Sequence, residues 1–582
     1  MTVTSRRPRR ASGPRGWAVA LILGLGLALY LPGLGVEILR SPLEVKYALV
    51  AREMVHGSSS LLVPHLFGVL YPDKPPLYFW VTAAFGWLGG GEIDELTARL
   101  PAALAAIAGL LVVYRLGADL FGPRAGLLSA CILATANLFF WYARQGHPDQ
   151  FLTTFVTVAC LGFWRSFATT GRRRGVWVAI AYAAMGLAVL SKGLLGLLLP
   201  LMAVTTYGLL TAPLRTLPRR LHLASGFAIF LAVVLAWYAP AVAQNGRGYV
   251  YETLVQQHVM RYASRWVHVE PWYYYLGFIV SGFFPWVLFL PAAVGLGWRV
   301  RHQASEPAGR AGDPPAGDPP AGDGPAGSAR HPVLFPLAWF VTGFVFLSLS
   351  ASKRGIYLLP LYPAAALLVG WLWDRTLAGR ASARLVGIPL VGLSAIAALL
   401  AVGLAIVPYP VLERYTSRGH VDTLVPQDPR QLAGVVALLL AGAVAVGWTW
   451  RRRRPALAFA LVTAIQAAVL LTVAVVRAPQ YEMRFPIRSF GARVSAIVPA
   501  DLPVLSLLKG ESLLAAFYLP RPVMLFSDTA ALLASRKTVP EPRYALVDGD
   551  EPIFDEPGVH RLAEAPFGKG RVVLVRVDPA PG

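Results

Sequence analysis

Charged residues are scarce in this chain, and acidic residues are the scarcer kind. They make up 14% of the 582 residues, against 56% that are hydrophobic, whereas an average soluble protein carries about 25% charged residues. The 53 Lys and Arg outnumber the 31 Asp and Glu, which leaves a net charge of +22. In a soluble protein such a surplus is typical of nucleic-acid binding. Because this chain has too little polar surface to coat a soluble globule, we expect a membrane protein with no nucleic-acid partner.

Cysteine is nearly absent as well. Cys131 and Cys160 both lie in apolar runs, which excludes a disulfide framework and a cysteine-based metal site. The sequence also contains no nucleotide phosphate-binding loop, no dinucleotide fingerprint and no metalloprotease helix motif. These absences argue against a nucleotide-sugar donor bound from the cytoplasm. They leave the cofactor unknown, with a divalent cation as one option.

Long apolar runs, by contrast, are abundant. A spanning helix needs about 20 mostly apolar residues, and the sequence offers about thirteen such runs. The predicted fold is therefore an all-α polytopic membrane protein. The runs are centred on 17–35, 99–116, 124–141, 149–168, 175–190, 193–211, 222–241, 273–297, 333–350, 355–373, 385–407, 432–450 and 456–476.

Basic residues mark the loops that we expect to face the cytoplasm. Arg-rich segments precede the first run and recur at Arg172–Arg174 and Arg451–Arg454. Short cytoplasmic loops are enriched in Lys and Arg, so the N-terminus is predicted to be cytoplasmic. An odd number of spans then places the C-terminal tail outside.

The chain divides into three predicted parts. Residues 1–15 form a basic cytoplasmic tail, residues 16–476 a transmembrane domain, and residues 477–582 a small extracytoplasmic α/β domain. Within the second part, 36–98 is a long outer loop with interfacial helices, and 303–331 is a Pro/Gly/Ala repeat typical of a disordered cytoplasmic linker. The strands of the third part are predicted from β-branched and aromatic runs at Val504–Leu508, Pro522–Phe526, Tyr544–Val547 and Val572–Val577.

Ionisable side chains gather at the predicted outer ends of the spans. Such residues are costly near a membrane and are a functional hint, although a lysine or arginine there often only reaches for the headgroups. Lys and Arg together suit the phosphate of a lipid carrier, and a nearby carboxylate could deprotonate an acceptor or hold a metal ion. The candidates are Glu44, Asp73, Lys74, Asp149, Lys192, His258, Arg261, Lys353 and Tyr357.

Seven motifs around these residues follow one order along the chain. From about residue 30 to 373 they resemble the bacterial membrane glycosyltransferases that include lipid A aminoarabinose transferase and the protein O-mannosyltransferases, which have the GT-C fold. The motifs are EVKYALVAREM, VPHLFGVLYPDKPPLYFW, RLPAAL, PDQF, SKGLLGLLLP, HVMRY with EPWYYY and FPW, and SASKRGIYLLPLYP.

The resemblance implies transfer of a sugar from a polyprenyl (undecaprenyl) phosphate donor at the outer face of the bacterial cytoplasmic membrane. The acceptor would be lipid A, another lipid, a glycan or a protein. Lys74 would bind the carrier phosphate with help from Arg261 and His258 of the HVMRY segment. The same cavity would be lined by Lys192, Lys353 and Tyr357.

One position departs from the family pattern. The family's first outer loop carries an Asp-Glu pair where this chain has Leu43–Glu44. Glu44, Asp149 and Asp73 are then the candidate catalytic carboxylates, or the chain is altered in mechanism. The competing interpretations are a lipid flippase or transporter, and a carrier-lipid-binding protein without transferase activity.

Overall fold

The computed structural model describes most of the chain. The basic tail 1–15 and nearly all of the predicted linker 303–331 lie outside the described residues. The described residues are 16–39, 41–211, 213, 216–260, 269–303, 331–407, 428–484, 486–507, 510–519, 521, 523–537, 540–567 and 570–580.

Long apolar helices dominate the described part of the chain. Eight of them are long and apolar enough to cross a membrane, or up to ten if each bent pair is counted as one span. The protein is therefore a multi-pass membrane protein. The long helices are α4 (Glu95–Phe121), α7 (Asp149–Ala168), α8 (Gly171–Lys192), α11 (Leu223–Val250), η4 (Gly355–Leu361) with α16 (Tyr362–Leu377), α17 (Arg384–Ile406), α19 (Pro429–Arg451) and α20 (Pro455–Arg484).

All thirteen predicted runs coincide with helices, but not every run is one long helix. Two runs are broken, by 68° between α5 (Pro123–Ala134) and α6 (Asn137–Ala143), and by 112° between α13 (Tyr274–Gly282) and the segment made of η3 and α14. Three runs give shorter apolar helices, so a count of thirteen spans stays a prediction. The remaining bounds are α1 (Gly16–Tyr30), α9 (Leu195–Thr211), α10 (Leu217–Leu221), η2 (Tyr251–Met260), η3 (Trp286–Phe289), α14 (Leu290–Gln303) and α15 (Leu334–Leu349).

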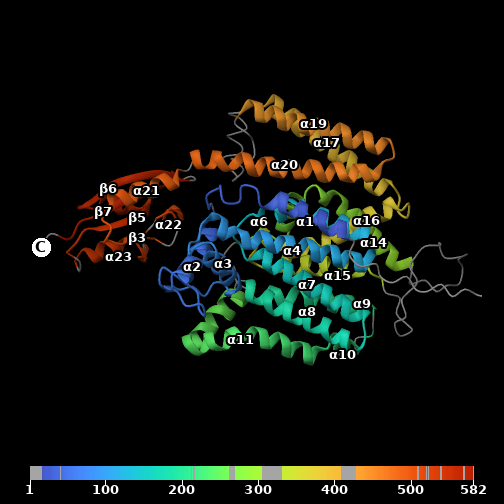
Figure 1. Ribbon diagram of the computed structural model, residues 1–582, viewed down its shortest axis with the longest axis horizontal. Helices are drawn as coiled ribbons and strands as arrows, with labels where there is room; N and C mark the ends of the chain where they lie inside the picture. The colour runs from blue at the N-terminus through green and yellow to red at the C-terminus, as the bar shows by residue number, and fades with distance from the viewer. Residues whose placement is uncertain are drawn as a thin grey trace, which may run out of the picture.

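The spanning helices share one large core. Small residues let the helices approach closely: a Cβ added to Gly126 of α5 would lie 2.4 Å from the carbonyl oxygen of Tyr114 in α4, so only glycine fits there. By contrast, α17 and α19 keep many large apolar side chains exposed and lie at one side of the bundle (Figure 1). Exposed apolar faces of this kind are what a lipid environment solvates.

The first outer loop folds into two helices and a small hairpin. Helix α2 (Pro42–Val55) packs against α3 (Leu77–Leu88), whose bounds match the predicted interfacial segment. Strands β1 (His65–Leu66) and β2 (Val69–Leu70) form the hairpin between them. The Glu53 carboxylate accepts from the Phe67 and Gly68 backbone amides and so fixes the hairpin to α2.

The C-terminal part is a small α/β domain, as predicted. Its sheet has the order β4-β3-β5-β7-β6, with parallel pairing of β3 to both β4 and β5 and antiparallel pairing among β5, β7 and β6. The four predicted strands are present, but β6 was missed because its run, VHRLAEAPF, carries three ionisable side chains. The bounds are α21 (Ile487–Ile497), β3 (Val504–Ser506), α22 (Gly510–Phe517), β4 (Val523–Leu525), α23 (Thr529–Ala534), η5 (Ser535–Lys537), β5 (Arg543–Asp548), η6 (Pro552–Asp555), β6 (Val559–Phe567) and β7 (Gly570–Val577).

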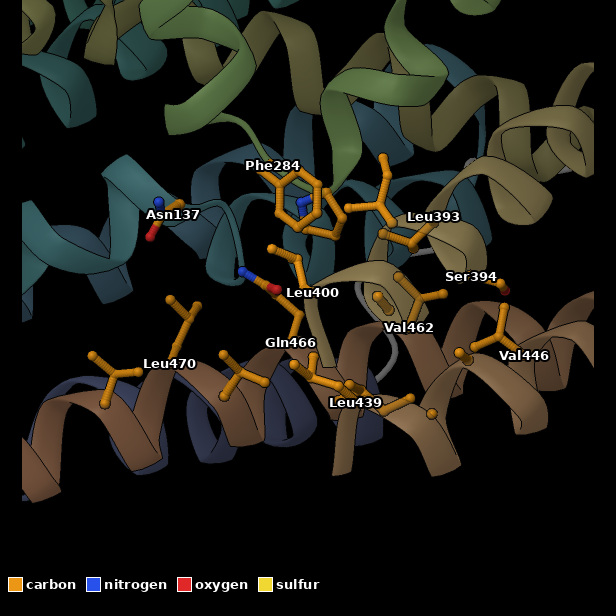
Figure 2. A pocket seen from close by; sticks show the side chains of 18 of the residues that line it. Asn137, Phe284, Leu393, Ser394, Leu400, Leu439, Val446, Val462, Gln466 and Leu470 are labelled. Carbon is orange, nitrogen blue, oxygen red and sulfur yellow. The ribbon is translucent and has the colours of Figure 1, made fainter. Parts of the chain in front are cut away.

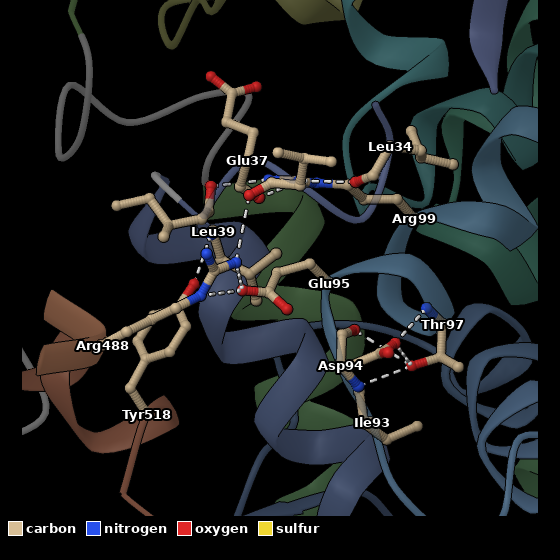
Figure 3. A network of polar contacts seen from close by, with 12 residues as sticks. Leu34, Glu37, Leu39, Ile93, Asp94, Glu95, Thr97, Arg99, Arg488 and Tyr518 are labelled. Atoms are coloured by element: carbon tan, nitrogen blue, oxygen red, sulfur yellow. Dashed lines mark hydrogen bonds and ion pairs between the residues drawn. The ribbon is translucent and has the colours of Figure 1, made fainter. Parts of the chain in front are cut away.

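This domain packs directly on the first outer loop. Figure 1 shows α2 and α3 between the helical bundle and the sheet, and one apolar cluster contains buried residues of α2, α3, α21, α22 and the sheet. Polar contacts reinforce it: Tyr518 Oη accepts from Leu39 N at 2.7 Å, and Arg488 pairs with Glu95 at the start of α4 (Figure 3). The two segments therefore form one packed unit although they are far apart in sequence.

Arg52 makes two hydrogen bonds at this interface, and they give a first test. Its guanidinium donates to Phe517 O at 2.7 Å and to Ile93 O at 3.0 Å, and it lies 4.0 Å from the centroid of the Phe517 ring. We expect Arg52→Leu to destabilise the docked domain by about 2–4 kcal/mol, because charged hydrogen bonds and a cation–π contact are lost. The measurement is protease cleavage of the C-terminal domain in detergent-solubilised protein. Arg493→Leu is the control, since the contacts that Arg493 makes with described residues, to Glu564 O and the Phe490 ring, stay within its own domain. Equal sensitivity of both variants would contradict the assignment.

Candidate functional site

A polar cavity of about 190 Å³ lies where the first outer loop meets the ends of three helical segments. Its walls come from α2, from the turn before α3, from the junction of α6 and α7, from the end of α8, and from the extended segment before η4. These segments bring together residues that are up to some 300 positions apart. The lining residues are Leu43, Tyr47, Asp73, Lys74, Tyr142, His147, Asp149, Lys192, Ser352, Arg354, Ile356 and Tyr357.

The α7–α8 hairpin supplies an acid and a base to this cavity. Asp149 is the first residue of α7 and Lys192 the last residue of α8, so a short link between the two helices places them side by side. They form a buried ion pair, and Lys192 Nζ also lies 4.7 Å from the centroid of the Tyr357 ring. A carboxylate at a helix N-terminus and an ammonium at a helix C-terminus each complement the helix dipole.

A second acid–base pair comes from the turn before α3. Asp73 Oδ1 accepts from Gln257 Nε2 of η2 at 2.8 Å, and Lys74 Nζ donates to the Asp73 carbonyl at 2.9 Å. Pro75 and Pro76 follow and restrict the backbone, and α3 begins at Leu77. The turn therefore presents both side chains at the cavity wall.

Arg354 contributes a third cation, next to a lysine that points elsewhere. Ser352 and Arg354 line the cavity, whereas Lys353 between them donates to Glu270 O at 2.8 Å and to Ser350 O at 2.5 Å. Successive side chains of an extended segment point to opposite sides, and Ser352 forms a β-bridge with Val269. Burial lowers the pKa of Lys353. Lys353 therefore lies outside the cavity lining, and Arg354 takes the place predicted for it.

Glu44 is buried beside the cavity, in contact with a different arginine. Arg99 Nε donates to Glu44 Oε1 at 2.8 Å. Arg99 also donates to the carbonyls of Leu34, Glu37 and Ile38, and Figure 3 shows it beside Leu34 and Glu37. Burial alone would raise the pKa of Glu44, but Arg99, the Gly146 amide and His147 outweigh it, and the pKa lies below its ordinary value. Leu43, the residue before it, faces the cavity instead.

The turn between α6 and α7 depends on this buried pair. Gly146 N donates to Glu44 Oε1 at 2.8 Å, and a Cβ at Gly146 would lie 2.9 Å from both Ala98 O and Tyr78 Oη. Arg144 fixes the other end of the turn by donating to the carbonyls of Leu29, Tyr30 and Pro32. His147 and Asp149 are thus held at the cavity wall by neighbours that do not themselves line it.

Two predicted binding residues cannot be placed. Arg261 and the side chain of His258 lie outside the described residues. Within the described part, no group of three or more His, Cys, Asp and Glu side chains could hold a metal ion. We derive no catalytic step through a metal.

A second cavity, of about 280 Å³, is of a different kind. It lies among α17, α19, α20 and the bends at α6 and Phe284–Pro285, and Figure 2 shows mainly aliphatic side chains around it. Its polar members are Asn137, Ser394 and Gln466, and none of the described residues that line it is charged.

Comparison with known proteins relates the cavity to a family. Residues 73–238 match the sequence profile described as dolichyl-phosphate-mannose-protein mannosyltransferase. The structure superposes with a TM-score of 0.74 on ArnT from Cupriavidus metallidurans bound to undecaprenyl phosphate, at 23% identity and covering 96% of this chain and 98% of that one. The chain therefore has the same fold as this ArnT.

ArnT-like relatives also match in sequence. The undecaprenyl phosphate-alpha-4-amino-4-deoxy-L-arabinose arabinosyl transferase of Edwardsiella ictaluri is 29% identical over 394 residues, 66% of this chain and 65% of the relative. A Pseudomonas fluorescens enzyme of the same name is 30% identical over 372 residues, 63% and 61% of the two chains. The match thus spans somewhat less than two thirds of these relatives. The predicted resemblance and fold class are confirmed.

The ionisable lining residues that are absent from the predicted set are Arg354 and His147. Arg354 lies in the motif SASKRGIYLLPLYP, and His147 directly precedes the motif PDQF. In an extended segment successive side chains point to opposite sides, and this alternation is the sequence feature that could have distinguished Arg354 from Lys353. No sequence signal separates Glu44 from Leu43, because the choice depends on Arg99, 55 positions further on.

The Glu44–Arg99 pair gives a second test. Removing one partner leaves a buried charge without compensation and costs about 3–5 kcal/mol, so Glu44→Ala and Arg99→Ala should each yield little monodisperse protein. Glu564→Ala, which removes an exposed ion pair with Arg571 at 3.9 Å, should behave as wild type. Normal yield and thermal stability of Glu44→Ala would contradict the role given to this pair.

His147 gives a third, pH-dependent test. Burial lowers its pKa to about 4, with Lys192 and Arg354 acting in the same direction and Asp149 and Glu44 opposing. The unfolded chain therefore binds more protons between the ordinary pKa of about 6.5 and about 4, and stability falls as the pH is lowered through that window, by at most about 3 kcal/mol. Unfolding midpoints measured from pH 7 to pH 4.5 should drop for wild type and change less for His147→Gln. Equal slopes would show that folding does not lower the pKa of His147.

Proposed function

We propose that this chain is a glycosyltransferase that moves a sugar from a polyprenyl-phosphate-linked donor to an acceptor at the outer face of the bacterial cytoplasmic membrane. The observation that carries the proposal is the polar cavity, in which Lys74, Lys192 and Arg354 stand beside Asp73 and Asp149. The undecaprenyl phosphate bound to ArnT from Cupriavidus metallidurans and the names of the sequence relatives support the same carrier. The acceptor is lipid A, another lipid, a glycan or a protein.

The charges of the cavity suit a phosphate leaving group. In the reaction the bond between the sugar C1 and the phosphate oxygen breaks, and C1 bonds to an oxygen of the acceptor. The polyprenyl phosphate then gains one negative charge. The three cations are already in place to bind that charge, which lowers the barrier because no reorganisation is needed.

The two carboxylates have separate tasks in this proposal. Asp149 holds Lys192 in place through their ion pair, and Asp73 is oriented by Gln257. Both lie where positive charge develops on the sugar, so each can stabilise it electrostatically. Glu44, the third predicted carboxylate, supports the turn that carries Asp149.

The proposed topology follows from the cavity and the arginine-rich loops. Asp149 and Lys192 lie at the ends of α7 and α8 that are opposite Arg172–Arg174. If those arginines are cytoplasmic, the cavity opens to the outer side and the α/β domain lies there too. We keep 16–476 as the membrane domain and 477–582 as the extracytoplasmic domain in this proposal.

The decisive experiment measures sugar transfer by purified protein in lipid. Radiolabelled polyprenyl-phosphate sugars are supplied with membrane lipids and cell-envelope extracts as acceptors, and wild type is expected to transfer label. Arg354→Ala and Lys192→Ala should lower the rate about 10- to 100-fold, because each removes a charged contact to the phosphate worth roughly 1.5–3 kcal/mol.

Arg380→Ala is the matched control, since Arg380 is exposed in the short connection between α16 and α17. It should transfer at the wild-type rate. Binding of polyprenyl phosphate without transfer from any donor would support the carrier-binding alternative. Movement of labelled carrier across the bilayer without transfer would support a flippase.

A further inference from the structure

His147 is a buried polar side chain that the proposed chemistry has not yet used. It is 4% exposed and lines the polar cavity. Its ring lies edge-on between Tyr47, at 5.5 Å and 90°, and Tyr142, at 5.3 Å and 89°. Among the described residues, neither ring nitrogen has a hydrogen-bond partner, although the backbone amide donates to Gln145 O. An imidazole held this firmly, with nitrogens left for a ligand, is unusual for a residue that only fills space.

Each acidic side chain at this cavity has a hydrogen-bond or ion-pair partner. Asp149 is paired with Lys192, and Asp73 accepts from Gln257. Glu44 faces Arg99 rather than the cavity. Position 43, which does face the cavity, carries leucine. A transfer to a hydroxyl needs a proton acceptor beside the sugar, and His147 is the lining group whose basic atoms are left for it.

We propose that His147 is the general base of this site and that the acceptor therefore presents a hydroxyl group. This inference rests on the proposed function. As the acceptor oxygen bonds to the sugar C1, its proton passes to a ring nitrogen of His147, and the C1–phosphate bond breaks with both electrons going to the phosphate oxygen. The imidazolium then releases the proton to water. Atoms and charge balance without an oxidant, a reductant or a co-reactant.

The surroundings keep the imidazole neutral and ready to accept. The charged groups that face it are Glu44 from α2, Asp149 from α7, Lys192 from α8 and Arg354 from the segment before η4. Burial and the two cations outweigh the two acids, and the pKa falls to about 4, close to that of an ordinary carboxylate. Because position 43 carries leucine and the base at position 147 is neutral, the net positive charge of the cavity is larger than it would be with a carboxylate base.

The test pairs two positions that line the same cavity. His147→Gln keeps a polar side chain but cannot take the proton, so kcat should fall about 100-fold or more, with KM for the donor changed less than threefold. Leu43→Asp alone is measured alongside as the reference for the added carboxylate. In the double variant Leu43→Asp with His147→Gln, the new carboxylate supplies a base, and kcat should recover at least tenfold over His147→Gln. Leu43→Asn with His147→Gln is the matched control and should not recover.

Two further measurements separate chemistry from folding. The wild-type rate should decline as the pH falls toward the pKa of His147, and this decline should be absent in His147→Gln. Polyprenyl phosphate binding by each variant is measured alongside, so that a misfolded variant is recognised by lost binding.

The outcomes are distinct. Wild-type transfer to a phosphate group, or a His147→Gln variant with unchanged kcat, would overturn the inference while leaving the proposed transferase intact. A recovery by Leu43→Asn equal to that by Leu43→Asp would also overturn it. If wild type binds the carrier but transfers from no donor to any acceptor, the proposed function itself fails, and the inference with it.

Discussion

The buried ion pair between Glu44 and Arg99 is the interaction on which the arrangement of the cavity depends. Arg99 lies at the start of a spanning helix and reaches Glu44 in the first outer loop together with three backbone carbonyls. Glu44 in turn accepts from Gly146 and so holds the turn that carries His147 and Asp149. The main effect of this ion pair is not on the free energy of unfolding, since buried ion pairs contribute little net stability. It joins three segments in a single geometry that none of them could adopt alone.

The cations and the acids of this cavity are held in different ways. Lysine and arginine come from three different segments, so the cation cluster exists only when the first outer loop, the α7–α8 hairpin and the segment before η4 are assembled. Each acid in the lining has a partner of its own, Lys192 for Asp149 and Gln257 for Asp73. His147 lies in the same lining, and its ring nitrogens have no hydrogen-bond partner among the described residues. Such preorganisation is the usual basis of electrostatic catalysis.

Much of this arrangement was open to prediction from the sequence, because composition and periodicity report directly on burial. Apolar runs identified the long helices of the bundle, and β-branched and aromatic runs identified four of the five C-terminal strands. The failures are local. Strand β6 carries charged side chains on an exposed face, so its sequence does not resemble an apolar strand. The bends between α5 and α6 and between α13 and α14 do not change the hydropathy of the runs in which they occur. Lys353 and Arg354 are neighbouring cations, and only the side of the extended segment to which each side chain points decides which of them lines the cavity. In the same way, the direction of each side chain around the axis of α2 decides that Leu43 faces the cavity and Glu44 does not.

The shared core of the first outer loop and the C-terminal domain sets an order for biosynthesis. Residues of α2 and α3 are made early, whereas α21, α22 and the sheet that cover them are made last. The early helices therefore expose apolar surface until the chain is complete. Tyr518 and Arg52 close the contact only then, so the cavity between the loop and the bundle reaches its final shape after the last strand has formed. A chain truncated before residue 487 would carry every cavity residue and still lack the surface against which α2 and α3 are packed.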